Sequence, residues 1–342
     1  MATTSLSSPA HRVSELINGF WATQAIHAAV ALGLVDHIAE GGATVAALAE
    51  RAEAHAPSIL RLLRALQTLD LCRIGSAGTL ELSPAGEVLR AGAPGSLRGR
   101  ALFAGDMLWR QFGDLTHVVK TGEPARGVAS GPEGFAQLAA QPARLDAFQT
   151  SMAEGSERAA RGAVRAYDFG RFRTVLDLGG GYGGVLSILL AAYPALRGAV
   201  CDLGYLREGA TAYLGRAGVA DRGAFVAGDF FDAVPSGYDA IVMKFILHDW
   251  DDVRARRILE NCRAAAAPHS RVILLEQVVP QPLGHGCADR DVMRADLTMM
   301  TVGGQERTAS EYDALCASAG WRLTGITPVE AGFDLIEAVP AG

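Results

Sequence analysis

His248 is the side chain in this sequence best placed for acid–base chemistry. It follows an apolar run in MKFILHDWDD, residues 243–252, a pattern typical of a buried strand and its carboxyl end. Glu276 ends another apolar run in LLEQVV, and Glu306 lies in GGQERT. A buried carboxylate is costly without a partner, and an imidazole held by one or two carboxylates can act as a positioned general base. We therefore predict that the three side chains meet, the alternative being a structural or solvated histidine.

A glycine-rich stretch, VLDLGGGYGGVL, indicates a place where a ligand approaches the backbone closely. Gly179, Gly181 and Gly184 match G-x-G-x-x-G, the spacing of dinucleotide sites, which is a weak signal alone. Asp177 stands two residues before the first glycine. A carboxylate there would repel a pyrophosphate but would suit a ligand that carries an ammonium and a sulfonium group. This pattern favours S-adenosylmethionine as the cofactor.

Two further acids follow the next two apolar runs of the chain. Asp202 ends AVCDL, where it could accept hydrogen bonds from ribose hydroxyls, and Asp229 in AGDFF could accept from an adenine amine, with Phe230 against the ring. An acid after the second strand alone would fit NAD equally well. Three acids at successive strand ends fit the methyl donor better than they fit NAD or solvated strand termini.

The elements that must position these side chains begin at residue 174. Short apolar runs alternate with helical segments, which is typical of a parallel sheet covered on both faces. We predict an α/β, doubly wound, Rossmann-like domain, with ligands beyond the carboxyl ends of its strands. The predicted strands are TVLDL, GAVCDL, GAFVAGDFF, YDAIVMKFIL, RVILLEQVV, WRLTGIT and FDLIEAV.

The N-terminal region predicts a small helical domain of the winged-helix type. Residues 14–38 are apolar nearly all round, so a helix there must be buried against its own domain or a second subunit. Thr44 is a suitable N-cap for TVAALAERA, and Pro57 suits the first turn of the next helix. CRIGSAGTLELS predicts two strands around a Ser-Ala-Gly turn. The buried stripe of the helix after Pro57 is expected at Leu60, Leu63, Leu66 and Leu69.

A winged helix can bind DNA, but this sequence favours dimerisation. The would-be recognition helix carries Arg61 and Arg64 but also Asp70, fewer cations than a reader helix needs. RAGAPGSLRG, residues 90–99, is the expected boundary. We predict a winged-helix-like dimerisation domain over 1–98 and a catalytic domain over 99–342, which contains a helical acceptor-site segment at 101–166 and a Rossmann-like core at 170–342.

Composition narrows the class of protein further. The 342 residues are 49% hydrophobic and 20% charged, a globular balance, and the net charge of −6 disfavours broad nucleic-acid binding. No apolar run approaches the roughly 18 residues of a membrane span, and the first residues do not read as a signal peptide. The five cysteines are scattered without a CxxC pair, and the histidines show no ligand-like cluster. We expect a cytoplasmic protein without a metal, a membrane partner or a nucleic-acid partner.

The motifs together resemble a known family. LDLGGGYGG, CDL, GDFF, KFILHDWDD, LLEQVVP and GGQERT are similar to the signature blocks of S-adenosylmethionine-dependent O-methyltransferases of the caffeate/flavonoid type. They are similarly close to the bacterial antibiotic-tailoring branch, which includes anthracycline methyltransferases. The resemblance covers nearly the whole chain and implies a homodimer formed through the N-terminal domain. It also implies metal-independent methylation of a phenolic or catechol hydroxyl on an aromatic small molecule.

The resemblance assigns roles to individual positions of this chain. His248 would deprotonate the acceptor hydroxyl, with Glu276 and Glu306 orienting it. DLTMMTVGG is shorter than in plant relatives, which implies a reshaped acceptor pocket. The donor site would use Asp177, Gly179, Gly181, Asp202, Leu203, Asp229, Phe230 and Lys244, and the acceptor site Phe148, Met152, Asp249, Asp296 and Met299.

Three other functions stay open at this point. One is an NAD-dependent dehydrogenase, and a second is a winged-helix regulator that senses the methyl donor. The third is a methyltransferase-like enzyme that uses the same cavity for hydroxylation, decarboxylation or pericyclisation; His248, Glu276 and Glu306 argue against it. The Ala/Gly/Arg-rich composition suggests a bacterial source and hence natural-product tailoring.

Overall fold

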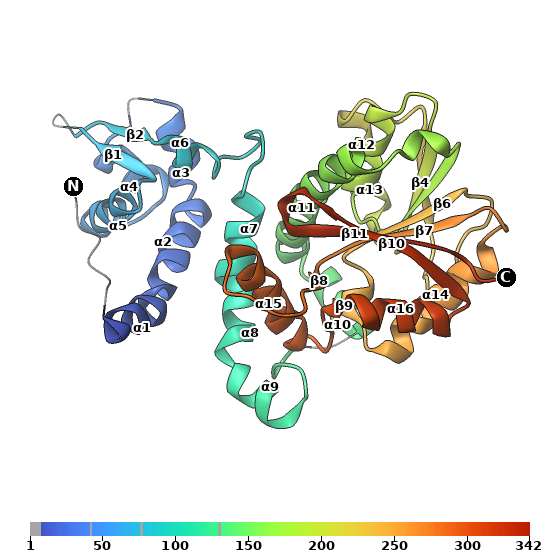
Figure 1. Cartoon of the computed structure of the whole chain (residues 1–342). Coiled ribbons are helices and arrows are strands. Elements are labelled where there is room, and N and C mark those ends of the chain that lie inside the picture. Colours follow the sequence, from blue (N-terminus) through green and yellow to red (C-terminus); the bar gives the residue numbers. More distant parts are fainter. Residues whose placement is uncertain (1–7, 42, 76–77, 129–130) are drawn as a thin grey trace, which may run out of the picture. The chain divides into compact units, whose positions relative to one another are not determined.

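The computed structural model describes residues 8–41, 43–75, 78–128 and 131–342 (Figure 1). The chain divides into two compact units, Met1–Trp109 and Arg110–Gly342. We describe each unit by itself. The predicted domain boundary near residue 98 stays a prediction. Within the described residues, no helix combines the length and the apolar character that a membrane crossing requires.

The first unit consists of short helices and one hairpin. Its helix–helix–hairpin order is the one that the sequence predicts, and β1 pairs with β2 in antiparallel register. The central turn residues of the hairpin, 76–77, lie outside the described residues. The elements are α1 (Pro9–Asn18), α2 (Phe20–Ala31), α3 (Leu34–Ala39), α4 (Val45–Arg51), α5 (Ala56–Thr68), β1 (Cys72–Ile74), β2 (Leu80–Leu82), α6 (Pro84–Glu87), α7 (Arg98–Phe103) and a π-helical turn (Ala104–Leu108).

Local chemistry explains where these helices begin and which side they bury. The Thr44 hydroxyl accepts a hydrogen bond from the Ala47 amide and caps α4. Pro57 lies in the first turn of α5. The predicted stripe of α5 is partly wrong: Leu63 and Leu66 are buried, but Leu60 and Leu69 are only half-buried. Ile59 is buried in their place, because it lies four residues before Leu63 on the same helical face.

Residues 14–38 were predicted as one helix, buried against its own domain or a second subunit, and this helix is divided into three. Gly19 separates α1 from α2, and Gly33, with φ of +68°, ends the segment before α3. Apolar side chains from α2 and α3 pack into the core of the unit. In α1 no residue is buried, and Leu16 and Ile17 are 72% and 67% exposed. The N-terminal part of this segment is therefore not covered by its own unit.

The second unit contains a seven-stranded sheet in the order β10-β11-β7-β6-β3-β4-β5. Strands β7, β6, β3, β4 and β5 are parallel to their neighbours, as predicted. Strands β10 and β11 are antiparallel, because only Glu330–Gly332 joins them and a parallel pair needs a crossover of about a dozen residues. The strands are β3 (Thr174–Leu178), β4 (Arg197–Asp202), β5 (Gly223–Ala227), β6 (Ala240–Lys244), β7 (Arg271–Glu276), β10 (Trp321–Val329) and β11 (Phe333–Pro340).

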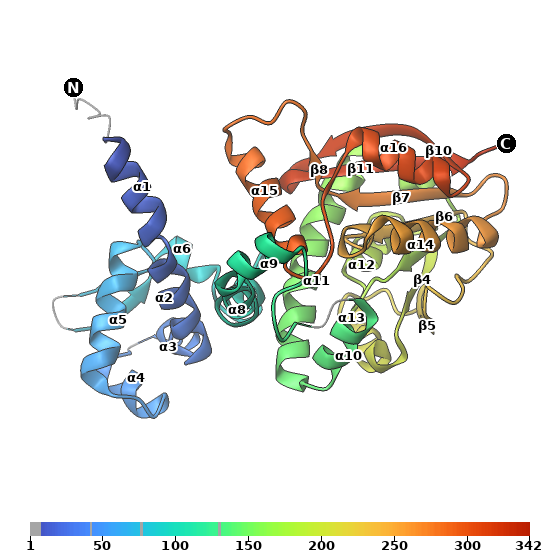
Figure 2. The same cartoon turned by 90° about the horizontal axis from the view of Figure 1, so that it is seen from below.

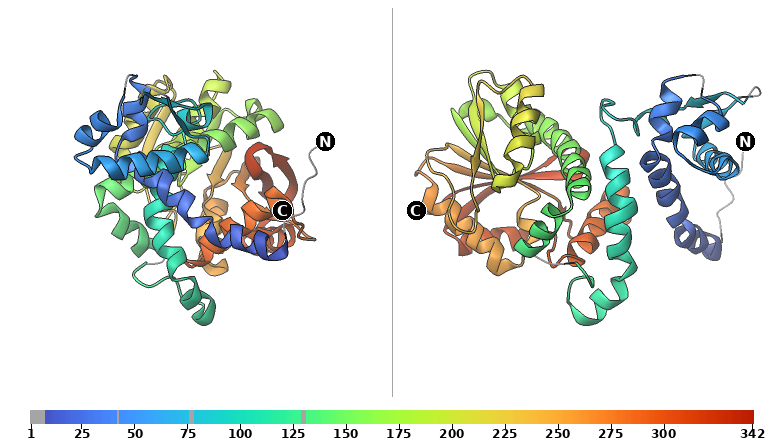
Figure 3. Two further views of the ribbon diagram at one scale, coloured as in Figure 1. Left: turned by 90° about the vertical axis from the view of Figure 1, so that its left-hand side faces the viewer. Right: turned by 180° about the vertical axis from the view of Figure 1, so that it is seen from behind.

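Helices cover both faces of this sheet (Figures 2 and 3). Alternate residues of β3 show the two-sided burial: Val175 packs with α11 and α12, and Leu176 packs with α14 and α16. A short parallel pair, β8 (Val278–Val279) with β9 (Arg307–Thr308), lies outside the main sheet. The helices are α8 (Trp109–Gly113), α9 (Leu115–Thr121), α10 (Gly131–Ala139), α11 (Pro142–Ala166), α12 (Gly184–Ala192), α13 (Arg207–Arg216), α14 (Asp252–Ala265), α15 (Cys287–Met300) and α16 (Ala309–Ser318).

Candidate active site

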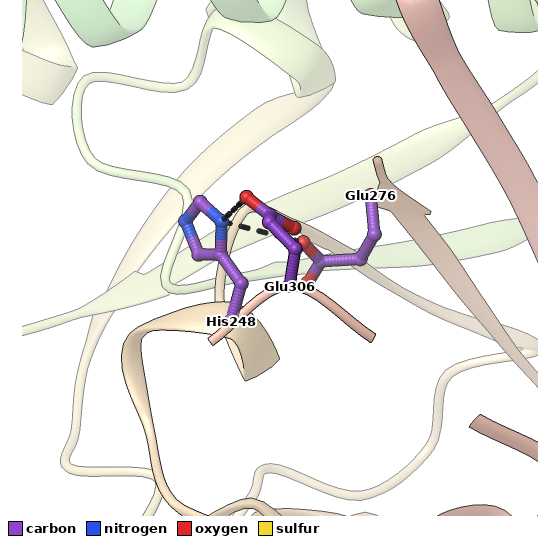
Figure 4. A group of neighbouring side chains, drawn as sticks. All are labelled: His248, Glu276 and Glu306. Carbon is purple, nitrogen blue, oxygen red and sulfur yellow. Dashed lines mark hydrogen bonds and ion pairs between the residues drawn. The ribbon is translucent and has the colours of Figure 1, made fainter. Parts of the chain in front are cut away.

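Three segments bring His248, Glu276 and Glu306 together in the second unit (Figure 4). His248 lies in the 3₁₀ turn Leu247–Asp249 after β6, Glu276 is the last residue of β7, and Glu306 directly precedes β9. One ligand atom from each of the three side chains lies within 4.8 Å of the others. His248 and Glu276 thus lie close together because the adjacent parallel strands β6 and β7 end at the same edge of the sheet.

The imidazole of His248 is surrounded by carboxylates. Its Nδ1 atom lies 2.8 Å from Oε1 of Glu306 and 3.9 Å from Oε2 of Glu276. Its Nε2 atom lies 3.5 Å from Oδ1 of Asp249. The imidazole and the Glu276 and Glu306 carboxylates are buried. When Nδ1–H donates to Glu306, Nε2 carries the ring's free lone pair, which is the atom that can accept a proton.

Backbone hydrogen bonds hold the turn that carries His248. Oε1 of Glu276 accepts from the amides of Ile246 and Leu247 at 3.2 and 3.0 Å. The buried guanidinium of Arg307 donates to the carbonyls of Leu247 and Trp250, at 2.8 Å each. Sequence reasoning missed Arg307; its place beside Glu306 in GGQERT was the signal. The turn is therefore fixed from both sides, which places the imidazole in one orientation.

Phe245 is a second residue that sequence reasoning missed. Its backbone has φ of +54°, a left-handed conformation that costs a residue other than glycine about 1–3 kcal/mol. Its ring stacks on the His248 imidazole, with 4.3 Å between centroids and 19° between planes. The Lys244 Nζ atom lies 4.2 Å from the centre of the same phenyl ring. The strained backbone therefore places an aromatic ring against the imidazole.

The carboxylates set the charge state of the imidazole. Burial by itself would lower the pKa of His248, but the negative charges of Glu306, Asp249 and Glu276 raise this pKa to about 9. Burial raises the pKa of Glu276 to about 7 and that of Asp249 to about 6. Burial also lowers the pKa of Lys244 to about 8. At neutral pH the imidazole of the free protein is consequently protonated on both nitrogens and carries a positive charge.

The glycine-rich loop joins β3 to α12 and needs glycine at two predicted positions. Gly179 and Gly181 have φ of +68° and +57°. A Cβ atom on Gly179 would lie 2.4 Å from the side chain of Ile246, and one on Gly181 would lie 2.6 Å from Oε1 of Gln149. Gln149, in α11, was not predicted as a site residue, although it stands in FQTSM between two that were. The loop is therefore closely packed and lies next to the turn that follows β6.

Two of the predicted acids accept hydrogen bonds from backbone amides in this loop and its neighbouring elements. Asp177 is 1% exposed, and its Oδ2 accepts from the Leu186 amide at 3.1 Å. Asp202 accepts from the amides of Gly181 and Leu203, at 2.8 and 2.7 Å. Burial raises the pKa of Asp177 to about 7 and also raises the pKa of Asp202. The two carboxylates hold the loop in shape, and their contacts with a donor stay predictions.

Asp229 and Phe230 lie at the end of the next strand. Oδ1 of Asp229 accepts from the Phe231 amide at 2.8 Å. The Phe230 ring lies edge-on to Phe231 and to Trp250, with centroids 4.9 and 6.0 Å apart. A Cβ on Gly179 would lie 3.4 Å from the Phe230 ring, so the ring borders the glycine loop. This placement agrees with a flat ring system next to the loop.

The predicted acceptor residues come from α11, from α15 and, for Asp249, from the turn that carries His248. Phe148 and Met152 are half-buried on α11, and Met299 is half-buried on α15. The Phe148 ring lies 6.4 Å from Phe135 of α10, centroid to centroid. Oδ1 of Asp296 accepts from the backbone amide of Glu306 at 3.0 Å. Asp296 thus acts on the base cluster through Glu306, while substrate contact at these positions stays a prediction.

The sheet and the site define an α/β enzyme that binds a nucleoside-containing ligand beside a buried imidazole–carboxylate pair. Residues 112–322 match the O-methyltransferase domain family, and residues 14–90 match the O-methyltransferase dimerisation domain family. The chain belongs to the O-methyltransferase family. The resemblance predicted from the sequence blocks is confirmed.

Relatives match over nearly the full length. The phenazine O-methyltransferase of Lysobacter antibioticus is 36% identical, over 95% of each chain. The aclacinomycin 10-hydroxylase of Streptomyces purpurascens is 34% identical, over 92% of this chain and 86% of that protein. A solved O-methyltransferase from neocarzinostatin biosynthesis, bound to S-adenosylmethionine and 2-hydroxy-5-methyl naphthoic acid, is 33% identical with a TM-score of 0.78, covering 93% of this chain and 96% of that one.

Proposed function

We propose that the chain transfers a methyl group from S-adenosylmethionine to a phenolic or catechol hydroxyl of an aromatic small molecule, in bacterial natural-product biosynthesis. The observation that carries this proposal is the buried pair of His248 and Glu306, 2.8 Å apart, next to the glycine loop of an O-methyltransferase domain. The solved relative that holds both the donor and a naphthoic acid supports the choice of ligands.

Two features of the glycine loop support S-adenosylmethionine as the donor. The glycines at 179 and 181 lack the Cβ atoms that would crowd the loop, and the Phe230 ring borders that loop. We assign the nucleoside to Asp202, Leu203, Asp229 and Phe230. The Lys244 ammonium lies 4.2 Å from the centre of the Phe245 ring, which stacks on the His248 imidazole. When bound, the cofactor supplies a methyl group activated on a cationic sulfur.

His248 would act as the general base of the transfer. Its Nε2 atom would take the proton of the acceptor hydroxyl. The Nδ1–H group would keep its hydrogen bond to the Glu306 carboxylate, which stabilises the resulting imidazolium. A positioned base contributes about 10²–10⁴-fold, and alignment of the reactants contributes roughly 7–11 kcal/mol. The residues that fix the imidazole therefore matter along with the imidazole itself. The cationic sulfur of a bound donor, placed beside His248, would lower the pKa of His248 and favour the neutral imidazole, which is the form that can act as a base.

We also propose a homodimer in the cytoplasm, formed through the N-terminal unit. The dimerisation family matches this unit, and α1 exposes apolar side chains that its own unit leaves uncovered. All five cysteines are free thiols.

The relative named as a hydroxylase supports a second candidate function, hydroxylation of an aromatic substrate in the same cavity. One experiment separates the two functions. The purified chain is incubated with a panel of phenolic acceptors and with S-adenosylmethionine that carries a deuterated methyl group, and the products are analysed by mass spectrometry. Methyl transfer predicts one deuterated methyl group in the product. A product that gains one oxygen and no label would favour hydroxylation, and no labelled product from any phenol would contradict the main proposal.

A further inference from the structure

Three buried oxygen atoms of the second unit lack hydrogen-bond partners among the described residues. They are Oε2 of Glu276, Oε2 of Glu306 and the hydroxyl oxygen of Tyr312. Glu276 and Tyr312 are 0% exposed, and Glu306 is 5% exposed. Buried polar groups almost always have a partner, because an unpaired one has lost its hydrogen bonds to water. Two of these oxygens belong to the carboxylates around His248, whereas the proposed methyl transfer gives no role to Tyr312.

The fold brings Tyr312 to the sheet face from which the Glu276 side chain projects. Side chains alternate along a strand, so Glu276 lies on the same face of β7 as Leu274. Leu274 and Tyr312 belong to one buried core cluster, together with Leu247, the residue before His248. The helix that carries Tyr312, α16, begins directly after β9 and packs against it.

The first turn of α16 is held by a capping box next to Glu306. The Thr308 hydroxyl accepts from the Glu311 amide at 3.3 Å, and the Glu311 carboxylate accepts from the Thr308 amide at 2.7 Å. Tyr312 is the residue after Glu311. The backbone that carries Tyr312 is therefore fixed to the segment that carries Glu306.

The charges around Tyr312 agree with this placement. Burial raises the pKa of the Tyr312 hydroxyl well above its usual range, and the negative charges of Glu276 and Glu306 raise this pKa further. The hydroxyl therefore keeps its proton, and because a carboxylate only accepts, the hydroxyl is the donor in a hydrogen bond between them. The other titratable groups that act on Tyr312 or Glu276 come from the end of β6, the turn after it, β9 and α16; they are Lys244, His248, Asp249, Arg307 and Cys316.

We propose that Tyr312 is a positioning residue for the base: its hydroxyl donates a hydrogen bond to Oε2 of Glu276, directly or through one buried water that also contacts Glu306. Oε1 of Glu276 already accepts from two amides of the turn that carries His248. A donor on Oε2 fixes the other side of this carboxylate, and a buried water with about three polar partners is common in protein interiors. The role in positioning rests on the proposed function, but the contact itself does not.

The contact is tested by the stability of the full chain. Tyr312→Phe removes the hydroxyl and keeps the buried ring. Denaturant titration is carried out on the unaltered chain, on Tyr312→Phe, on Glu276→Gln and on the double variant. We expect Tyr312→Phe to raise the unfolding equilibrium constant by about 10- to 100-fold, the range of a hydrogen bond to a charged group, and to have a clearly smaller effect in the Glu276→Gln background. An unpaired hydroxyl predicts the opposite sign, because its removal relieves a buried unsatisfied group.

The positioning role is measured at His248 itself. Nuclear magnetic resonance of the chain with isotope-labelled histidine follows the pKa of the imidazole, and the signal is assigned by its loss in His248→Gln. Tyr312→Phe should lower this pKa, because Glu276 without its donor takes up a proton more readily and leaves less negative charge beside the imidazole. It should also lower kcat by about 10-fold, within the cost of a small misplacement, and leave donor affinity unchanged.

Tyr238→Phe is the matched control, because Tyr238 packs against the same core cluster but precedes β6, at the opposite edge of the sheet. It should leave the pKa of His248 and kcat unchanged. Additive effects of Tyr312→Phe and Glu276→Gln on stability, or a Tyr312→Phe variant as stable as the unaltered chain, would overturn the contact. Lower stability with an unchanged His248 pKa and kcat would overturn the positioning role. Neither unfolding nor resonance measurements need turnover, so a chain that transfers no methyl group would contradict the proposed function while these measurements still decide the contact.

Discussion

Oε1 of Glu306 lies 2.8 Å from Nδ1 of His248, and both side chains are shielded from solvent. This contact fixes the imidazole so that Nε2 is the atom left for chemistry. We expect His248→Ala to lower kcat by about 10²–10⁴-fold, the contribution of a positioned base. Affinity for S-adenosylhomocysteine, measured by calorimetry, should stay within a few-fold. His269→Ala is the control, because His269 is 71% exposed and far along the chain from the cluster. A loss of donor affinity in His248→Ala would argue for a structural role instead.

The same contact predicts how activity depends on pH. The carboxylates raise the pKa of His248 to about 9, so the base form grows as the pH rises toward that value, and kcat/KM should rise with it. Glu306→Gln removes one negative charge, lowers the pKa of His248 and should move the rising limb to lower pH. Its plateau should also fall, because the imidazolium loses its partner. A pH–rate profile with an unchanged midpoint would contradict the pairing, and Glu330→Gln, at an exposed ion pair, should leave the profile as it is.

Linkage gives a matching prediction for stability. The folded-state pKa of His248 lies above its unfolded value of about 6.5, so the charged imidazole contributes stability that is fully present below pH 6.5. That contribution is lost as the pH rises through about 9. In His248→Gln the free energy of unfolding should therefore fall less between pH 6.5 and 9 than in the unaltered chain, as measured by denaturant titration. Equal slopes over this range would show that the imidazole is not charged in the folded state.

The approach of the base groups could be predicted from the sequence because topology does most of the positioning. His248 and Glu276 follow two apolar runs, and neighbouring parallel strands end at the same edge of a sheet. The antiparallel course of β10 and β11 depends on a connection of three residues, Glu330–Gly332, which the apolar pattern alone does not distinguish from a crossover. The antiparallel direction of β10 and β11 was therefore missed, whereas the approach of His248 to Glu276 was predicted.

Contacts between side chains were much harder to predict than strand ends. The stack of Phe245 on His248 depends on a left-handed backbone at a bulky residue, for which the sequence carries no propensity signal. Asp177 shows the opposite case. Its position before the glycines suggested a ligand contact, which stays a prediction, and did not reveal that its carboxylate accepts from the Leu186 amide.

Phe245 should act as a positioning residue for the base. Phe245→Leu removes the stacked ring and lets the imidazole move, which should lower kcat by about 10- to 100-fold, the cost of a small misplacement. Acceptor KM should change little. Phe245→Tyr keeps the stacked ring and should retain most of the activity. Wild-type kcat in Phe245→Leu would show that the stack does not orient the base.

The glycine loop should fail when a side chain is added at its left-handed positions. Gly181→Val places a Cβ 2.6 Å from Oε1 of Gln149 and strains a backbone with φ of +57°. We expect it to abolish S-adenosylhomocysteine binding in calorimetry. Gly218→Val is the matched control: it has a similar φ of +70° but no atom within 4 Å of its Cβ. It should cost about 1–2 kcal/mol of stability and leave donor affinity unchanged. Equal loss of affinity in both variants would point to general destabilisation.

The exposed apolar side chains of α1 should be the part of the N-terminal unit that a second copy covers. Val13, Leu16 and Ile17 of α1, and Phe20 at the start of α2, are each more than half exposed. Burying a large aliphatic side chain is worth about 1.5–3 kcal/mol, so this surface is costly to leave in water. Leu16→Glu combined with Ile17→Glu should convert the dimer to a monomer in light scattering.

Val253→Glu is the control for that pair of substitutions, because Val253 is 80% exposed on α14 of the second unit. It adds one glutamate, half the charge of the double variant, at an apolar position outside the predicted interface, and the dimer should persist. The N-terminal unit has its own hydrophobic core, to which neither Leu16 nor Ile17 contributes. The double variant should therefore keep its helical content in circular dichroism, so that loss of the dimer can be told apart from unfolding. A dimer that survives both substitutions would place the interface on another surface.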